Sequence, residues 1–146
     1  MESRNQYGWC SNSNIIEYLF NNKKEIVLIR RKNPPFQGQL ALPGGFVDVG
    51  ETVESACIRE AKEETNINVK IHKLIGVFSS PDRDPRGHTV SIAFLCEPIS
   101  KKEKPKALDD AASLEIVALS EIQSMQLAFD HMDIVKKSGI LNSLYR

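Results

Sequence analysis

Short runs of apolar residues are separated along the chain by polar segments rich in proline, glycine and lysine. The runs that predict β-strands span residues 14–20, 25–31, 67–80, 88–98 and 114–119. Residues 40–50 look extended but are broken by Gly44 and Gly45, and helices are expected over residues 52–65 and 130–144. Because strands and helices mix without strict alternation, the sequence predicts a mixed α/β (α+β) fold, with a mixed sheet and helices packed against it.

The segments between these elements are expected to be turns and loops. The asparagine pair at residues 21–22 favours a hairpin between the first two strands, and two prolines exclude regular structure from residues 32–39. Residues 101–113 are polar and are expected to form a solvated loop. No repeat or linker divides the chain, so residues 1–146 are expected to form a single domain, with a loosely ordered N-terminal segment at residues 1–13.

Composition narrows the classes of function. A hydrophobic content of 41% with 26% charged residues is ordinary for a globular protein, and a formal net charge of zero argues against nucleic acid as a partner. No apolar run approaches the roughly 20 residues that cross a bilayer, and the N-terminus lacks a signal-peptide pattern, so no membrane partner is expected. Cys10, Cys57 and Cys96 have no paired spacing, which indicates reduced thiols in a cytoplasmic protein.

The helix expected at residues 52–65 places carboxylates where apolar side chains should lie. At roughly 100° per residue, Glu60 and Glu64 fall within about 20° of the centre of the apolar stripe, and Glu63 lies at its edge. In one interpretation these glutamates lie at the fringe and extend into water. In the other they face inward and bind a divalent cation together with the preceding loop that contains Gly44 and Gly45, the glycine loop. Like charges at this spacing repel unless a cation is present. Carboxylate and carbonyl oxygens are the ligands that Mg²⁺ and Mn²⁺ prefer.

The same residues carry a resemblance to a known family. Gly45, five residues, Glu51, seven residues and then "REAKEETNI" resemble the Nudix box of Nudix hydrolases. The resemblance implies a Nudix-type α/β/α sandwich with a mixed β-sheet, and metal-assisted hydrolysis of a nucleoside diphosphate linked to another group. Asn66 stands where the family usually has glycine, and Ala61 where a bulkier aliphatic residue is common. Asparagine tolerates a left-handed backbone, and neither departure removes a ligand.

The metal-binding residues follow from the resemblance. Glu60 and Glu64 look like the main ligands of Mg²⁺, or of Mn²⁺ as a substitute. Glu63 resembles a further ligand or a water-positioning group. The carbonyl of Gly45 resembles the backbone ligand that the loop contributes.

Other residues of the box are expected to support the ligands or to take part in catalysis. Arg59 lies off the stripe, and the resemblance implies that it holds Glu51 or Glu63 in place. Glu51 is either structural or catalytic. Thr52 is well placed to cap the helix N-terminus.

The rest of the substrate is expected to bind near the polar bend at residues 81–87. Composition alone favours an ordinary solvated connection there. However, "RDPRGH", "RRKNPPF", "LDDA" at Leu108 to Ala111 and "LAFDH" at Leu127 to His131 resemble the Nudix enzymes that act on ADP-ribose. The substrate-binding residues that this resemblance implies are Arg31, Lys32, Phe36, Arg83, Asp84, Arg86 and His88.

The basic residues of this set suit an anionic substrate. Arg83 or Arg86 is expected to clamp a phosphate or ribose hydroxyl groups through its fork of donors. Arg31 or Lys32 is expected to steer the pyrophosphate.

Two of the listed residues, Phe36 and His88, have two interpretations each, and two residues of the "LAFDH" stretch have a supporting role. Phe36 offers a ring to the adenine or plugs the loop. His88 joins the substrate site or only begins the following strand. Asp130 and His131 are expected to cap and brace the last helix.

Three functions remain in view. The leading one is a Mg²⁺-dependent ADP-ribose pyrophosphatase that releases AMP and ribose 5-phosphate. The second is a pyrophosphohydrolase that clears modified nucleoside triphosphates from the nucleotide pool. The third is a non-catalytic Nudix-like sensor of ADP-ribose, but such regulators carry a DNA-binding segment after the domain, which is not expected in this chain. Resemblance to the family also suggests a homodimer.

Overall fold

The structure, a computed structural model, describes residues 9–20, 23–105 and 111–145. The elements are β1 (Trp9–Phe20), β2 (Lys23–Arg31), β3 (Leu40–Ala41), β4 (Gly44–Phe46), α2 (Val53–Thr65), β5 (Val69–Phe78), β6 (Thr89–Pro98), β7 (Ala111–Ala118), α3 (Leu119–Ile122), α4 (His131–Ser138) and the 3-10 helix η1 (Ile140–Tyr145). In this described part of the chain, no helix has both the length and the apolar character that a membrane span requires.

The strands form a mixed sheet in the order β3-β2-β1-β6-β5, with β4 beside β1 and β7 beside β2. β1 and β6 run parallel, with Ile16 opposite Cys96. The other pairs of strands are antiparallel. The predicted mixed sheet is therefore confirmed.

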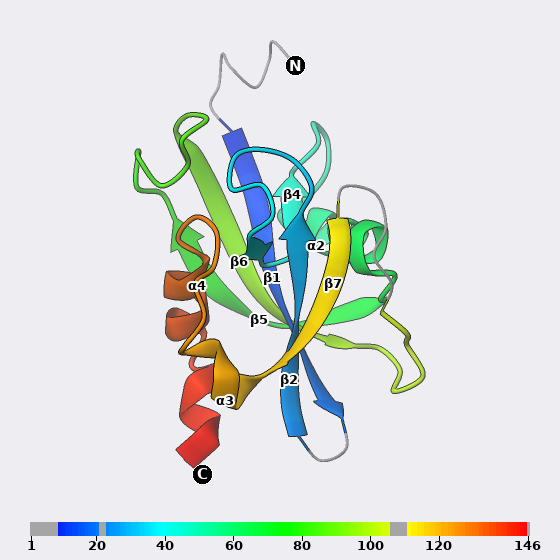
Figure 1. Cartoon of the computed structure of the whole chain (residues 1–146). Helices are drawn as coiled ribbons and strands as arrows, with labels where there is room; N and C mark the ends of the chain where they lie inside the picture. Colours follow the sequence, from blue (N-terminus) through cyan, green and yellow to red (C-terminus); the bar gives the residue numbers. More distant parts are fainter. Residues whose placement is uncertain (1–8, 21–22, 106–110, 146) are drawn as a thin grey trace.

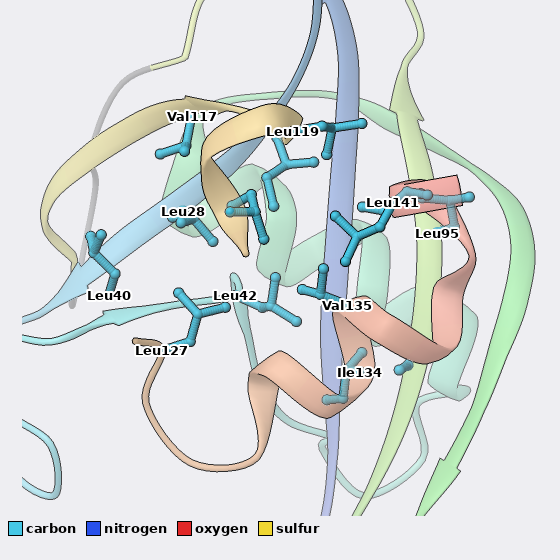
Figure 2. Close-up of a cluster of buried hydrophobic side chains, with 14 residues drawn as sticks. Leu28, Leu40, Leu42, Leu95, Val117, Leu119, Leu127, Ile134, Val135 and Leu141 are labelled. Carbon is cyan, nitrogen blue, oxygen red and sulfur yellow. The ribbon is translucent and has the colours of Figure 1, made fainter. Parts of the chain in front are cut away.

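Alternate residues of the central strands face two separate layers, as the pleat of a strand requires. On β2, Leu28 belongs to one buried cluster and Val27 to another. The first cluster packs under α3 and α4, and Figure 2 shows its side chains meeting between those helices and the strands. The second packs under α2 through Cys57 and Ala61. The helices therefore cover opposite faces of the sheet (Figure 1), which confirms the α/β/α sandwich.

Two of the three cysteines meet inside the second cluster. Cys57 on α2 and Cys96 on β6 are buried, with their Sγ atoms 3.4 Å apart, whereas Cys10 is exposed. All three are free thiols. Their spacing along the chain did not predict this contact, because it joins elements that lie 39 residues apart.

The first strand begins earlier than predicted. β1 starts at Trp9, so residues 9–13 of the segment expected to be loosely ordered are part of this strand. The polar residues 11–13 are held because β4 and β6 pair with them on both sides. Backbone pairing of this kind does not depend on apolar side chains, which explains why the apolar pattern missed it.

Two boundaries near the C-terminus also differ. β7 begins at Ala111, within the expected loop, because it pairs with β2 as far as Arg31. The closing helix ends at Ser138, since Gly139 takes a φ of 81° that favours glycine, and η1 follows it. The predicted turn at residues 21–22 and residues 108–110 of the "LDDA" stretch lie outside the described residues.

Candidate metal centre and substrate cavity

Helix α2 is capped at both ends by its own sequence. The Oγ1 of Thr52 accepts a hydrogen bond from the backbone N–H of Ser55 at 3.0 Å, so the predicted N-cap is confirmed. Asn66 ends the helix with a φ of 63°, the left-handed conformation expected of it. Cys57 and Ala61 pack into the core. The rotation of the helix is thereby fixed, and the next residues on that face turn toward the glycine loop.

Glu60 and Glu64 both point at this loop. The Oε2 of Glu64 accepts a hydrogen bond from the N–H of Gly44 at 3.0 Å, and Glu64 is only 8% exposed. The side chain of Glu60 is 13% exposed. Its carboxylate lies so close to Gly45 that a methyl group on that residue would meet it at 2.6 Å. These two glutamates face inward, so the interpretation that placed them at the fringe is wrong.

Arg59 ties the acidic residues together. Its Nε and Nη2 donate to both oxygens of Glu51 at 2.6 and 2.8 Å. Its Nη1 donates to Glu60 at 2.8 Å and to Glu63 at 3.0 Å. The sequence predicted a contact with either Glu51 or Glu63, and the structure has both. Glu63 is the most open of these acids, since its side chain is 46% exposed.

The electrostatics favour an additional cation. The hydrogen bonds from Arg59 lower the pKa of Glu51 to about 2. Burial raises the pKa of Glu60 above its ordinary value, although the guanidinium of Arg59 opposes this. An ionised carboxylate that is costly to bury is stabilised by a nearby positive charge.

The oxygen donors suit a hard divalent cation. Glu60 and Glu64 bring hard carboxylate oxygen atoms to one place beside Gly44 and Gly45. Within the described ranges, no group of three or more His, Cys, Asp or Glu side chains is arranged to hold a metal by itself. A bound cation would therefore complete its shell with the backbone carbonyl, water or substrate oxygens.

The glycine loop and both inward glutamates line a cavity of about 350 Å³. Arg31 and Lys32 also line it, as does the bend that contains Arg83, Asp84 and Arg86. The fold thus brings most of the predicted metal-binding and substrate-binding residues to one cavity.

Arg83 is almost completely engaged by the protein. Its side chain is 5% exposed, and its Nε and Nη2 donate to the two oxygens of Asp130 at 2.8 and 2.7 Å. Its Nη1 donates to the Thr89 carbonyl at 3.3 Å and to Ser91 at 2.7 Å. Asp130 stands at the N-cap position of α4, as expected, and its carbonyl accepts from the N–H of Asp133 at 2.9 Å, but its side chain makes no cap hydrogen bond and binds Arg83 instead. These contacts favour Arg86 over Arg83 as the arginine that meets substrate.

Arg86 combines an ion pair with aromatic contacts. It donates to Asp84 at 2.8 Å, and its guanidinium carbon lies 5.1 Å from the centroid of the Phe46 ring and 5.5 Å from that of Phe129. Arg31 approaches the same Phe129 ring at 4.8 Å. These contacts place two guanidinium groups, with their positive charge, against the aromatic wall of the cavity.

Two predicted substrate residues lie elsewhere. Phe36 packs in a small core cluster that includes Ile29, with its ring centroid 4.7 Å from that of Phe129, which agrees with the plug interpretation. His88 is exposed, and its Nε2 lies 3.0 Å from the carbonyl of Ser79. It immediately precedes β6, as the second interpretation had it.

Several cavity residues were not identified from the sequence. Phe46, Phe129, Ser13 and Ser91 line the cavity, but in the sequence they resemble ordinary core or strand residues. Phe129 belongs to the "LAFDH" stretch, whose family resemblance by itself assigns no role to this side chain.

His131 was expected to brace the last helix, but it braces the approach to the glycine loop. Its Nδ1 accepts a hydrogen bond from the N–H of Leu42 at 3.0 Å, and the side chain lines the cavity. The N–H of Ala128 donates to the carbonyl of Leu40 at 2.8 Å, which fixes the same two segments together. Burial lowers the pKa of His131 to about 4, so its ring is neutral at neutral pH.

Known proteins resemble this chain in sequence and in fold. The NUDIX domain family matches residues 12–137. An ADP-ribose pyrophosphatase of Methanocaldococcus jannaschii is 50% identical over 121 residues, which are 83% of this chain and 69% of that protein. A bifunctional NMN adenylyltransferase/ADP ribose pyrophosphatase from Francisella tularensis, solved with AMP and a Mn ion, has a TM-score of 0.76 and 31% identity over 88% of this chain and 40% of that chain. The NUDIX domain of Shewanella oneidensis NrtR, solved with ADP ribose, shares the fold, with a TM-score of 0.78 and 20% identity over 94% of this chain and 96% of that chain.

The family match extends far beyond the box around α2. It begins within β1 and ends within α4, so it includes the sheet and both helical layers. Together with the arrangement of Glu60 and Glu64 around the glycine loop, this extent shows that the chain belongs to the Nudix family of hydrolases.

Proposed function

We propose that this protein hydrolyses the diphosphate bond of ADP-ribose with Mg²⁺, or Mn²⁺ as a substitute, and releases AMP and ribose 5-phosphate. The observation that carries the proposal is the placement of Glu60 and Glu64 against the glycine loop in the same cavity as Arg31 and Arg86. Acids that hold a cation and arginines that bind phosphate are what a diphosphate substrate requires. The names of the Methanocaldococcus and Francisella relatives support ADP-ribose as the substrate.

Each acidic residue has a distinct part in this proposal. Glu60, Glu64 and the Gly45 carbonyl would hold the cation, which when bound supplies charge neutralisation and a more acidic water. Arg59 positions Glu60 and Glu63 from the other side. Glu51 has both oxygens occupied by Arg59, which favours a positioning role over a catalytic one.

The cavity also suits the rest of the nucleotide. Its volume of about 350 Å³ is in the usual range for small-molecule sites. Arg31 and Lys32 supply positive charge for phosphate oxygens, and Arg86 adds a further guanidinium beside Phe46 and Phe129.

A panel of substrates tests the proposal. Purified protein with Mg²⁺ would be incubated with ADP-ribose and with normal and oxidised nucleoside triphosphates, and the products separated by chromatography. We expect AMP and ribose 5-phosphate from ADP-ribose, with the highest kcat/KM of the panel. Faster turnover of triphosphates would instead favour the pool-clearing function. Tight binding of ADP-ribose without products would favour a sensor.

We also propose a cytoplasmic homodimer. The three free cysteines agree with a reducing compartment. Light scattering coupled to size-exclusion chromatography is expected to give about twice the 16.4 kDa of the chain. A mass equal to one chain across a tenfold range of concentration would exclude the dimer.

We expect Gly45→Ala to reduce the affinity for the cation strongly and to lower the thermal stability of the fold only slightly. The added methyl group would lie 2.6 Å from the Glu60 carboxylate, so that side chain must leave the loop. The Mg²⁺ concentration for half-maximal hydrolysis should rise about tenfold or more, as it does when metal-site geometry is disturbed. A magnesium titration of turnover, with a thermal melt in parallel, measures both effects. An unchanged magnesium dependence would contradict the assignment of Glu60.

A further inference from the structure

The two ring nitrogens of His131 differ in their hydrogen bonding. Nδ1 accepts the hydrogen bond from the N–H of Leu42. Because a backbone N–H can only donate, Nδ1 carries no proton, and the proton of the neutral ring is on Nε2. Among the residues that the structure describes, Nε2 has no hydrogen-bond partner, although His131 is only 7% exposed. A buried donor left in this state is destabilising unless a ligand or water accepts from it.

The position of the ring suggests what accepts this hydrogen bond. His131 lines the cavity, and its bonding partner Leu42 lies two residues before Gly44, whose N–H binds Glu64. The backbone nitrogens of Leu42 and Gly44 are two residues apart along the chain, so at most about 7 Å separates them. The imidazole and the inward glutamates are therefore anchored to the same short segment, residues 42–44, and all of them line the same cavity. The centroid of the Phe129 ring lies 5.3 Å from that of the His131 ring, so Phe129 limits the other directions in which the imidazole can turn.

We propose that the Nε2–H of His131 donates a hydrogen bond to an oxygen of the substrate diphosphate. The inference rests on the proposed diphosphate hydrolysis and adds a substrate-contacting residue to it. The same ring holds the strand that leads to the glycine loop, so one side chain aligns the loop and the substrate. The ring stays neutral at neutral pH because burial lowers its pKa, and Nε2 therefore remains a donor while Nδ1 remains an acceptor.

Two substitutions separate the functions of the two nitrogens. His131→Asn can place an amide oxygen near the position of Nδ1 but has no atom at the position of Nε2. His131→Gln can place its amide nitrogen near Nε2 but leaves the N–H of Leu42 without an acceptor. We expect the asparagine variant to bind diphosphate at least about tenfold more weakly, since hydrogen bonds to charged groups are worth that much or more. The glutamine variant should bind within about threefold of the original protein but melt several degrees lower.

Calorimetry with Mg²⁺ and two probes gives the decisive comparison. Methylenediphosphonate carries a diphosphate analogue without base or sugar, and an α,β-methylene analogue of ADP-ribose carries all three. We expect His131→Asn to lose the same factor for both probes. Equal affinity of the original and asparagine proteins for both probes would overturn the proposal, and so would a loss confined to the ADP-ribose analogue.

The outcome also distinguishes this inference from the proposed function. If methylenediphosphonate binding shows the tenfold loss while ADP-ribose is neither bound nor hydrolysed, the substrate assignment fails and the role of His131 stands. Nitrogen-15 NMR of the unmodified protein gives a test that needs no variant. The Nε2–H signal of His131 should shift when methylenediphosphonate and Mg²⁺ are added, and an unmoved signal at saturation would overturn the proposal.

Discussion

Replacing Glu64 with glutamine is expected to lower kcat on the order of 100-fold or more while leaving the fold intact. The amide oxygen of glutamine can still accept the hydrogen bond that Gly44 donates to Glu64, so the loop keeps its position. The negative charge is lost, however, and with it most of the attraction for a divalent cation. Steady-state kinetics at fixed Mg²⁺, with a magnesium-binding titration, measures the loss.

The same helix offers a matched control for this substitution. Glu54 lies on the exposed side of α2, so Glu54→Gln removes one carboxylate from the helix without touching the loop. It should retain the original kcat. Glu63→Gln is informative beside them, because Glu63 is half exposed and held by Arg59. Full activity in both Glu63→Gln and Glu64→Gln would show that these carboxylates are not metal ligands.

Replacing Arg59 with methionine is expected to reduce both stability and turnover. Methionine keeps much of the length of the side chain but leaves Glu51, Glu60 and Glu63 without their shared cation. Fully buried ion pairs that lose one partner cost about 3–5 kcal/mol, and for this partly exposed group we expect roughly 2 kcal/mol. Turnover should fall about 10- to 100-fold because the ligands lose their orientation. Chemical denaturation and kinetics measure the two effects.

Magnesium should partly reverse this loss of stability. A cation bound by Glu60 neutralises some of the charge that Arg59 had neutralised, so the variant should gain more stability from Mg²⁺ than the original protein does. Arg30→Met provides the control, because Arg30 also pairs with a carboxylate, that of Glu115, but at the surface. Such exposed pairs contribute about 1 kcal/mol or less. An Arg59 variant no less stable than the Arg30 variant would contradict the proposed role.

The effect of Arg59 should also depend on pH. Arg59 lowers the pKa of Glu51 from 4.5 to about 2 in the folded protein. A lowered folded-state pKa stabilises the fold above the unfolded pKa, and this stabilisation is lost as the pH falls toward 2. The difference in stability between the original protein and Arg59→Met should therefore be largest above pH 4.5 and shrink below it. A difference that grew on acidification would contradict this assignment.

Local features of this protein were predictable from nearby residues. Thr52, Asn66 and the apolar stripe fix the ends and the rotation of α2, and the rotation turns Glu60 and Glu64 inward. The alternation of Ile26, Val27 and Leu28 divides β2 between two layers. These features depend on backbone geometry within a few residues, which the order of amino acids determines directly.

Contacts between distant segments were less accessible. Arg83 looked like a free phosphate-binding residue, but a carboxylate 47 residues later, that of Asp130, occupies its fork. His131 looked like a brace for its own helix, but its partner is the N–H of Leu42, 89 residues earlier. In each case the local pattern identified a polar residue near the site without specifying its partner.

By itself, the sequence determined the family, the inward acidic face of α2 and the glycine loop opposite it, because each is encoded within one short stretch. Only the tertiary structure decided which polar groups are already satisfied and which still face the cavity. The physical reason is that hydrogen-bond partners are chosen by distance in space. Here that distance is set by the order of the strands and by the clamp between residues 40–42 and 128–131.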